Sequence, residues 1–278
     1  MQIPTGGTVF FDSGVGGLTV LNACVRTSQE NVFYYYGDNE HAPYGNLSGA
    51  QVLAYTRDAF DMFHVLQPSA AVIACNTVTA HCVETLRKEH PYPIIGAEPA
   101  LLPACAHGGR VLVLATAATC KSEKFLRLCR LAKEKYPAVE IVIHPCPQLA
   151  RVIEGGGIFY DFDLSIHIPT MQVSSVVLGC THYIYIKERI KSWYNCQVFD
   201  GNLGISTRLS TTLAGKNRVD LSTKKGGFIH IDKKIRDKQP LFSTVNLFCE
   251  KNKKIYFLGP SANKNRTFYE QTFAISGK

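Results

Sequence analysis

Several marks of particular functional classes are absent from this sequence of 278 residues. No apolar run approaches the roughly 20 residues that a membrane-spanning helix needs. Residues 1–5 lack the basic start of a secretory signal. No two cysteines form a Cys-x-x-Cys pair, so the spacing typical of structural zinc sites is missing. We therefore expect a cytoplasmic protein with no membrane partner and no metal.

Cysteine is also too sparse for a disulfide scaffold, because 10 cysteines are spread over the whole length. A reducing compartment would keep them as thiols, and most free cysteines are small buried residues. The composition is 46% hydrophobic and 19% charged, which excludes a disordered chain. The length suffices for one large domain or two smaller ones, each with its own core.

The net charge of +8 is concentrated at the C-terminal end. Residues 216–278 hold 14 Lys and Arg against 5 Asp and Glu, whereas residues 1–215 are close to neutral. The pairs Lys224-Lys225 and Lys233-Lys234 lie among polar residues, which is typical of a solvated face. The alternative is a surface for an anionic partner. No nucleic-acid motif accompanies the charge, so we do not expect a nucleic-acid partner.

Short apolar runs alternate with helical patterns along the chain. The runs are rich in β-branched residues and end at polar or glycine residues; they span 8–11, 31–36, 70–74, 110–115, 140–143 and 174–178. Such runs predict fully buried parallel strands, and helical periodicity follows over 50–65, 80–88 and 121–135. The order indicates an α/β fold, whose ligands bind beyond the carboxyl ends of the strands.

Two of these runs end in matching hexapeptides, at residues 72–77 and 177–182, and each contains a cysteine: Cys75 and Cys180. The repetition favours two similar α/β halves, although such echoes also arise by coincidence. Each cysteine is expected where a helix begins, which lowers a thiol pKa. Inverting a stereocentre needs one group to remove a proton and another to deliver one to the opposite face. The pair therefore predicts a two-base racemase; a single reactive cysteine would instead suggest a hydrolase.

The glycine-rich stretch at residues 12–17 follows the first strand. Its spacing matches neither the dinucleotide fingerprint nor the P-loop. Asp12 is a candidate for holding an ammonium group and Ser13 for holding a carboxylate. The alternative is a plain tight turn.

Other polar residues are weaker candidates when taken alone. Tyr44 and Gly45 are expected in a loop whose backbone N–H groups suit a carboxylate, and Thr119 suits simple helix capping. Glu154 and His182 could each tune a thiol. A solvated surface carboxylate is the favoured interpretation of Glu154 on the sequence alone, and one structural hydrogen bond is the alternative for His182.

Taken together, these residues resemble the glutamate racemase family, within the cofactor-independent aspartate/glutamate racemase superfamily. The matching stretches follow the family's order over residues 8–200; they are residues 11–20, 37–38 with 43–45, 73–77, 115–116 with 118–119, 146–147 with Glu154, and 178–183.

The resemblance implies two similar parallel-sheet α/β domains facing each other across a cleft. The first comprises residues 1–97 plus 208–278, and the second residues 98–207. It implies interconversion of L- and D-glutamate without a cofactor, supplying D-glutamate for peptidoglycan, and we expect a homodimer.

The resemblance also implies a role for each matching residue. Cys75 and Cys180 would be the two bases, and Asp12, Glu154 and His182 would assist them. The residues that would hold the substrate are Ser13, Tyr44, Gly45, Asn76, Thr77, Thr119 and Thr181.

The sequence departs from the family at Ala115, where glycine is usual, at Ile184, where proline is common, and in the three glycines at 155–157. None of these removes a catalytic group. The alternatives are an aspartate or hydantoin racemase of the same superfamily, or a non-catalytic protein that binds an anionic partner through its basic C-terminal segment.

Overall fold

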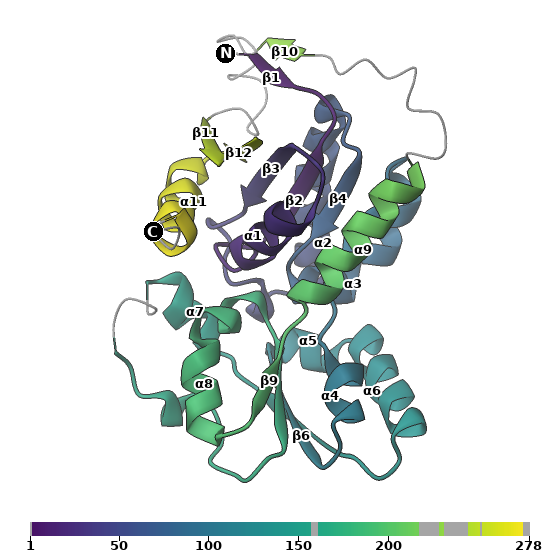
Figure 1. Ribbon diagram of the computed structural model, residues 1–278, viewed down its shortest axis with the longest axis vertical. Helices are drawn as coiled ribbons and strands as arrows, with labels where there is room; N and C mark the ends of the chain where they lie inside the picture. The colour runs from purple at the N-terminus through teal and green to yellow at the C-terminus, as the bar shows by residue number, and fades with distance from the viewer. Residues whose placement is uncertain (1, 157–160, 217–227, 231–243, 251, 275–278) are drawn as a thin grey trace.

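The computed structural model of the chain describes residues 2–156, 161–216, 228–230, 244–250 and 252–274. Gly157 and the basic pairs Lys224-Lys225 and Lys233-Lys234 lie outside these ranges. Figure 1 shows two lobes, one above the other, each built around its own sheet with helices on both sides.

The upper lobe contains a six-stranded sheet in the order β11-β12-β3-β2-β4-β5. Its strands are β2 (Thr8–Asp12), β3 (Val32–Gly37), β4 (Ala70–Ile73), β5 (Ile94–Gly96), β11 (Val245–Glu250) and β12 (Lys253–Leu258). All neighbours are parallel except the edge pair β11 and β12, which is antiparallel. A separate two-stranded sheet pairs β1 (Gln2–Pro4) with β10 (Phe228–His230). The C-terminal part of the chain therefore adds strands to the N-terminal sheet.

Helices cover both faces of this sheet. They are α1 (Leu18–Thr27), α2 (Gly49–Phe63), α3 (Asn76–Glu89), α9 (Asn202–Lys216) and α11 (Ala262–Tyr269), with the short helices η1 (Tyr44–Asn46), η2 (His64–Leu66) and η7 (Glu270–Ala274). Side chains alternate along β2: Val9 and Phe11 join the core under α2 and α3, and Phe10 joins the core under α1. This alternation buries every residue of the strand and explains why its sequence is a continuous apolar run.

The lower lobe contains a four-stranded parallel sheet in the order β7-β6-β8-β9. Its strands are β6 (Arg110–Ala115), β7 (Glu140–Pro145), β8 (Ser175–Gly179) and β9 (Gln197–Phe199). Its helices are α4 (Leu101–Ala106), α5 (Ala117–Lys121), α6 (Glu123–Lys135), α7 (Leu149–Glu154), η4 (Leu164–Ile166), η5 (Thr181–Ile186) and α8 (Lys187–Tyr194). Leu112 and Leu114 pack on one face of the sheet, and Val111 and Val113 on the other.

The predicted fold class is confirmed, since two α/β lobes, each with a mainly or wholly parallel sheet, lie next to each other (Figure 1). Each predicted strand exists within one or two residues of its expected ends. The prediction of full burial is wrong for β7, because it lies at the edge of its sheet and Ile143 is exposed. The domain boundaries stay a prediction. Helix α9 spans the expected boundary at residues 207 and 208, and its Ile205 and Leu209 pack in the core of the upper lobe. Among the described residues, no helix is both long and apolar enough to cross a membrane.

Candidate active site

The carboxyl ends of four strands from the two sheets converge where the lobes meet. Asp12 ends β2, Cys75 follows β4, Thr116 follows β6 and Cys180 follows β8. A small cavity of about 10 Å³ lies there. It is lined by Ser13, Pro43, Tyr44, Gly45, Cys75, Asn76, Thr77, Thr116, Ala150, Cys180, Thr181 and His182. The structure thus brings together most of the residues predicted for the site, and Asp12, Thr119 and Glu154 reach it through hydrogen bonds.

Cys75 lies on the upper-lobe side of the cavity, as the residue before α3. This confirms that a helix begins at this cysteine. Its Sγ is 3.6 Å from Oγ of Ser13. Burial, and after it the nearby carboxylate of Asp12, raise the pKa of the Cys75 thiol to about 12, although the Val78 N–H and Ser13 oppose the rise. The pKa of Cys75 is therefore raised and not lowered as its place at a helix start predicted, because the effect of burial outweighs that of the helix N–H groups.

Cys180 lies on the lower-lobe side and is buried, like Cys75. The helix that begins after it is the 3₁₀ helix η5, which continues into α8, instead of an α-helix. Its Sγ is 3.8 Å from Nδ1 of His182. The opposite ring nitrogen, Nε2, is 2.7 Å from Oε2 of Glu154. The three side chains form a chain of contacts that leads from the thiol to a carboxylate.

The charge of this chain depends on the pairing of His182 with Glu154. Burial lowers the pKa of His182, but the contacts with Cys180 and Glu154 outweigh it and raise the pKa well above 6.5. Burial raises the pKa of Glu154, but His182, Lys264 and the Val15 N–H outweigh it and lower the pKa to about 2. The pair is therefore ionised, with an imidazolium next to Cys180.

Glu154 is not the solvated surface carboxylate that the sequence alone favoured. Its side chain is only 9% exposed and lies between the lobes. The Val15 N–H donates to Oε2 at 2.9 Å, Asn39 Nδ2 donates to Oε1 at 2.5 Å, and Lys264 Nζ donates to Oε1 at 2.7 Å. Sequence reasoning missed Asn39 and Lys264, because they are 115 and 110 residues away along the chain.

Asp12 is fully buried directly behind the cavity wall. Its carboxylate accepts hydrogen bonds from the Gly14 N–H at 3.0 Å and from the Thr181 hydroxyl at 3.2 Å. Burial raises the pKa of Asp12 to about 6, against the lowering effects of His182 and the Gly14 N–H. Asp12 does not line the cavity itself. It contacts the cavity through Thr181, which does line it.

The glycines at residues 14–17 allow the two lobes to approach closely. A Cβ atom on Gly14 would lie 2.3 Å from Oε2 of Glu154, and one on Gly16 would lie 2.4 Å from Oγ1 of Thr181. Both distances are far below van der Waals contact. The plain-turn interpretation of this stretch is therefore insufficient, since the glycines leave room for groups of the opposite lobe.

Three threonines from both lobes form a hydroxyl cluster. Oγ1 of Thr77 is 3.0 Å from Oγ1 of Thr116 and 3.3 Å from Oγ1 of Thr119. The Thr116 side chain also accepts from the Thr119 N–H, so the residue that caps α5 is Thr116 and not Thr119. Since each hydroxyl both donates and accepts, the cluster can turn its donors toward a carboxylate.

The remaining predicted binding residues differ in what they offer. The amide Oδ1 of Asn76 is buried and has no hydrogen-bond partner within the described chain, so it is a free acceptor. The Tyr44 hydroxyl donates to Asp38 at 2.6 Å and is already engaged. Gly45 leaves η1 room beside Thr116, because a Cβ atom there would lie 2.8 Å from Cβ of Thr116.

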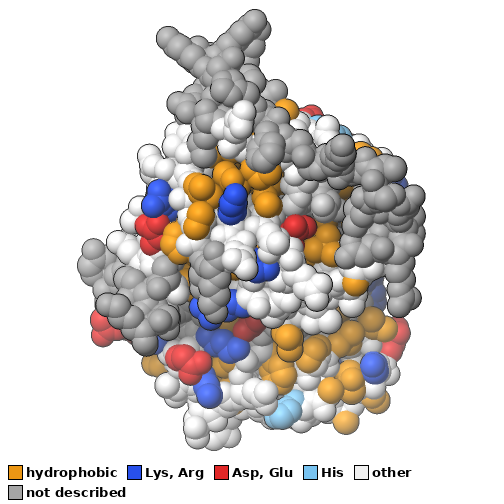
Figure 2. All heavy atoms as spheres, turned by 45° about the horizontal axis from the view of Figure 1, so that its top comes forward, with side chains coloured by type: hydrophobic (Ala, Val, Ile, Leu, Met, Phe, Trp, Pro, Cys, Tyr) orange, Lys and Arg blue, Asp and Glu red, His pale blue; other side chains and the backbone are white. Residues whose placement is uncertain are grey.

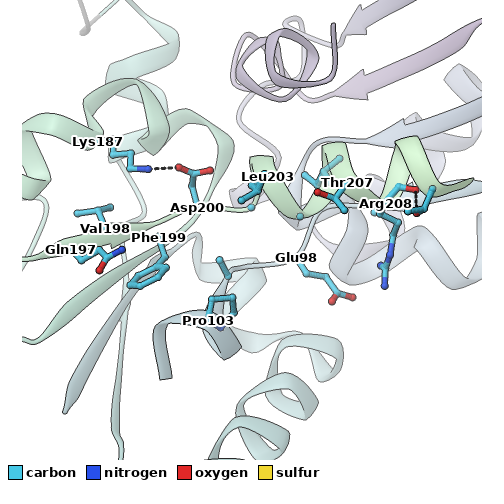
Figure 3. Close-up of a pocket in the computed structure, with 16 residues that line it drawn as sticks. Glu98, Pro103, Lys187, Gln197, Val198, Phe199, Asp200, Leu203, Thr207 and Arg208 are labelled. Carbon is cyan, nitrogen blue, oxygen red and sulfur yellow. Dashed lines mark hydrogen bonds and ion pairs between the residues drawn. The ribbon is translucent and has the colours of Figure 1, made fainter. Parts of the chain in front are cut away.

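A much larger cavity, of about 870 Å³, lies elsewhere, between β9 and the start of α9 (Figure 3). The two segments that connect the lobes, around Glu98 and Asp200, contribute to its wall. Its charged side chains include Lys187 and Asp200, which form an ion pair at 2.6 Å. Its lining contains no cysteine. The smaller cavity is the candidate active site because it holds the acid–base groups.

Basic residues of the C-terminal segment that the structure describes are largely paired. Lys253 donates to the carbonyl oxygens of Ser28 and Glu30, and Arg266 pairs with Glu270 at 2.7 Å. On the face shown in Figure 2, side chains of both signs lie near one another. Binding of an anionic partner through this segment stays an untested alternative.

Several known proteins are similar to this chain in sequence and in fold. A glutamate racemase of Clostridium botulinum (strain Kyoto / Type A2) is 37% identical over 227 residues, covering 78% of this chain and 87% of that protein. One of Clostridium novyi (strain NT) is 39% identical over 229 residues, with the same coverage. The crystal structure of glutamate racemase from Francisella tularensis in complex with D-glutamate aligns with a TM-score of 0.65 at 25% identity, covering 80% of this chain and 85% of that chain. No protein-family model matches the chain.

Proposed function

The chain belongs to the glutamate racemase family, and we propose that it interconverts L- and D-glutamate by a two-base proton transfer at Cα. One observation carries the mechanism: Cys75 and Cys180 line one cavity from different sheets, in opposite electrostatic environments. Cys75 has a carboxylate, Asp12, nearby, whereas Cys180 has a protonated imidazole nearby. The pKa of the Cys75 thiol is raised, and the Cys180 thiol has an imidazole next to it.

In one direction, the Cys180 thiolate removes the Cα proton, and the electron pair of the broken C–H bond moves into the adjacent carboxylate. The Cys75 thiol then donates its proton to the opposite face of the carbon. The product has the inverted configuration, and the two cysteines have exchanged protonation states. The reverse direction uses the same groups in reversed roles.

Residues around the two thiols suit an amino acid with two carboxylates. The free Oδ1 of Asn76 can accept from an α-ammonium group. The hydroxyls of Thr77, Thr116 and Thr119 can donate to a carboxylate. As the family resemblance implies, Ser13, Tyr44, Gly45 and Thr181 complete the binding residues, with the backbone of Tyr44 and Gly45 contributing because the tyrosine hydroxyl is engaged.

This chemistry requires only residues of the chain, and its D-glutamate product would serve peptidoglycan synthesis. The homodimer expected from the resemblance is part of the proposal. Sedimentation of the purified chain over a range of concentrations tests it independently of the activity.

The two-base mechanism makes a specific prediction for single variants. Cys75→Ala and Cys180→Ala should each abolish racemisation of both enantiomers, because every turnover needs a group on both faces. The remaining thiol of each variant should still exchange the Cα proton of one enantiomer, and the two variants should act on opposite enantiomers. Circular dichroism of L- and D-glutamate in heavy water, followed by mass spectrometry for deuterium at Cα, measures both effects.

Cys249→Ala is the matched control, since Cys249 is an exposed thiol and its loss should leave activity unchanged. Near-normal racemisation by either active-site variant would refute the two-base mechanism. Aspartate, tested alongside glutamate with the unmodified chain, decides the substrate: faster racemisation of aspartate would contradict the proposed specificity.

A further inference from the structure

A second group of polar side chains lies at the far end of α2 and α3, away from the candidate active site. It consists of Asp61 on α2, His64 on η2 and His90, the residue that follows α3. One ligand-type atom from each side chain lies within 4.8 Å of the other two. Asp61 and His64 are three residues apart on one continuous helical stretch, so they share a face.

The two imidazoles are within hydrogen-bond distance of each other. Nδ1 of His90 is 3.0 Å from Nε2 of His64, so one of these nitrogens donates a hydrogen bond and the other accepts it with its lone pair. The other nitrogen of His90, Nε2, is buried and lacks a hydrogen-bond partner among the described residues. The His90 ring is therefore hydrogen-bonded to His64 on its Nδ1 side, and a carboxylate oxygen of Asp61 lies within 4.8 Å of both rings.

Aromatic packing holds both rings in place. The His90 ring stacks on Tyr92 at a centroid distance of 5.5 Å and contacts Phe60 at 5.4 Å. The His64 ring meets the same Tyr92 edge-on at 5.9 Å. These contacts fix the orientation of both imidazoles. Asp61 and His64 are also exposed, so one side of the group is open to water.

We propose that Asp61, His64 and His90 form a zinc site that ties the end of α2 to the end of α3. Two imidazole nitrogens and one carboxylate oxygen are ligands that Zn²⁺ accepts, with water completing a tetrahedron. The bound cation replaces the contact between the two rings by two metal–nitrogen bonds, and Asp61 offsets part of its charge. The site requires no cysteine, and its ligands come from segments 26 residues apart.

The position of the group implies a structural role. Helices α2 and α3 lie side by side in the upper lobe (Figure 1), and both begin near the candidate active site, after Ser48 and Cys75. Because α3 has 14 residues, its far end is about 20 Å from Cys75 at the usual helical rise. Zinc at this end would stabilise the helix pair without contacting the substrate.

Titration with ZnCl₂ under reducing conditions tests the proposal, with calorimetry and thermal unfolding as readouts. The unmodified chain should bind one Zn²⁺ that raises its unfolding temperature. His64→Gln and the isosteric Asp61→Asn should weaken this binding by more than the roughly 10- to 100-fold that loss of an outer-shell partner costs. Both variants should keep the racemase activity of the metal-free chain.

His81→Gln is the matched control, because His81 is an exposed histidine on the same helix α3. It should bind Zn²⁺ as the unmodified chain does. Zinc could also bind to Cys75 and Cys180. Such binding would be equal in all variants, because it does not involve Asp61 or His64, and it would inhibit the activity. Equal affinity and equal thermal stabilisation in the unmodified chain and in both site variants would overturn the proposal, as would the absence of tight binding in the unmodified chain.

Discussion

Replacing Asp12 by asparagine should stabilise the folded chain and impair its activity at the same time. Asp12 is fully buried, and burial is the largest cause that raises its pKa from 3.8 to about 6. A folded-state pKa above the unfolded value means that the folded chain holds the proton more tightly. The stabilising effect of that proton is complete below pH 3.8 and is lost as the pH rises through 6.

The magnitude follows from the two pKa values. Each pKa unit corresponds to about 1.4 kcal/mol, so ionisation of Asp12 lowers the free energy of unfolding by about 3 kcal/mol at pH 7.5 and by only about 1 kcal/mol at pH 4.5. The neutral amide of the Asp12→Asn variant avoids this cost, and its oxygen can still accept from the Gly14 N–H. The variant should therefore gain stability over the unmodified chain, and the gain should grow by about 2 kcal/mol between the two pH values.

Urea unfolding at pH 4.5 and pH 7.5 measures this difference directly. Asp58→Asn is the matched control, because Asp58 is an exposed aspartate on α2 and its variant should show no comparable gain. Racemisation by Asp12→Asn should fall by about 100-fold, the lower range for loss of an acid–base group. A stability difference that does not change with pH would refute the argument that the Asp12 carboxyl has a raised pKa.

Two further predictions concern the contacts between the lobes. Glu154→Gln should lower the free energy of unfolding at pH 7 by about 3 kcal/mol, because the pKa of Glu154 is about 2 in the folded chain instead of 4.5. The stability difference between the variant and the unmodified chain should become smaller as the pH falls below 4.5. Urea unfolding at several pH values checks this. Gly16→Ala should reduce kcat/KM by at least about 10-fold, because its Cβ atom would lie 2.4 Å from Oγ1 of Thr181 and small displacements in a site cost such factors. Gly204→Ala on α9 is the control for the glycine variant, since no atom lies within 4 Å of the added Cβ, and steady-state kinetics should find it unchanged.

The sequence predicts those elements of the fold whose pattern of apolar residues is contained within a few consecutive residues. Strands β2, β4, β6 and β8 are buried on both faces, so each is a continuous apolar run that needs no knowledge of its neighbours. Strands β5 and β9 have three residues each, too few for a pattern. The C-terminal strand β12 was not predicted, although Ile255 and Phe257 are fully buried, because its place beside β3 is set by tertiary packing.

The sequence could not predict contacts between side chains that lie far apart along the chain. Burial of Glu154 depends on Asn39 and Lys264 of the other lobe, and neither has a local pattern that points to the glutamate. The expectation of no metal rested on cysteine spacing. The histidine pair at residues 64 and 90 follows no such spacing, since it arises from the packing of α2 against α3.

The same contacts between the lobes bear on how a substrate reaches the thiols. The cavity between Cys75 and Cys180 has a volume of about 10 Å³, enough for about one water molecule and too small for glutamate. The Val15 N–H donates to Glu154, the Tyr185 hydroxyl donates to the Val15 carbonyl at 2.7 Å, and Thr181 donates to Asp12. Each of these bonds joins one lobe to the other. If the chain racemises glutamate at these two thiols as proposed, the lobes would have to separate and these bonds would have to break before the substrate could enter. Closure of the lobes around the substrate would then shield it from water.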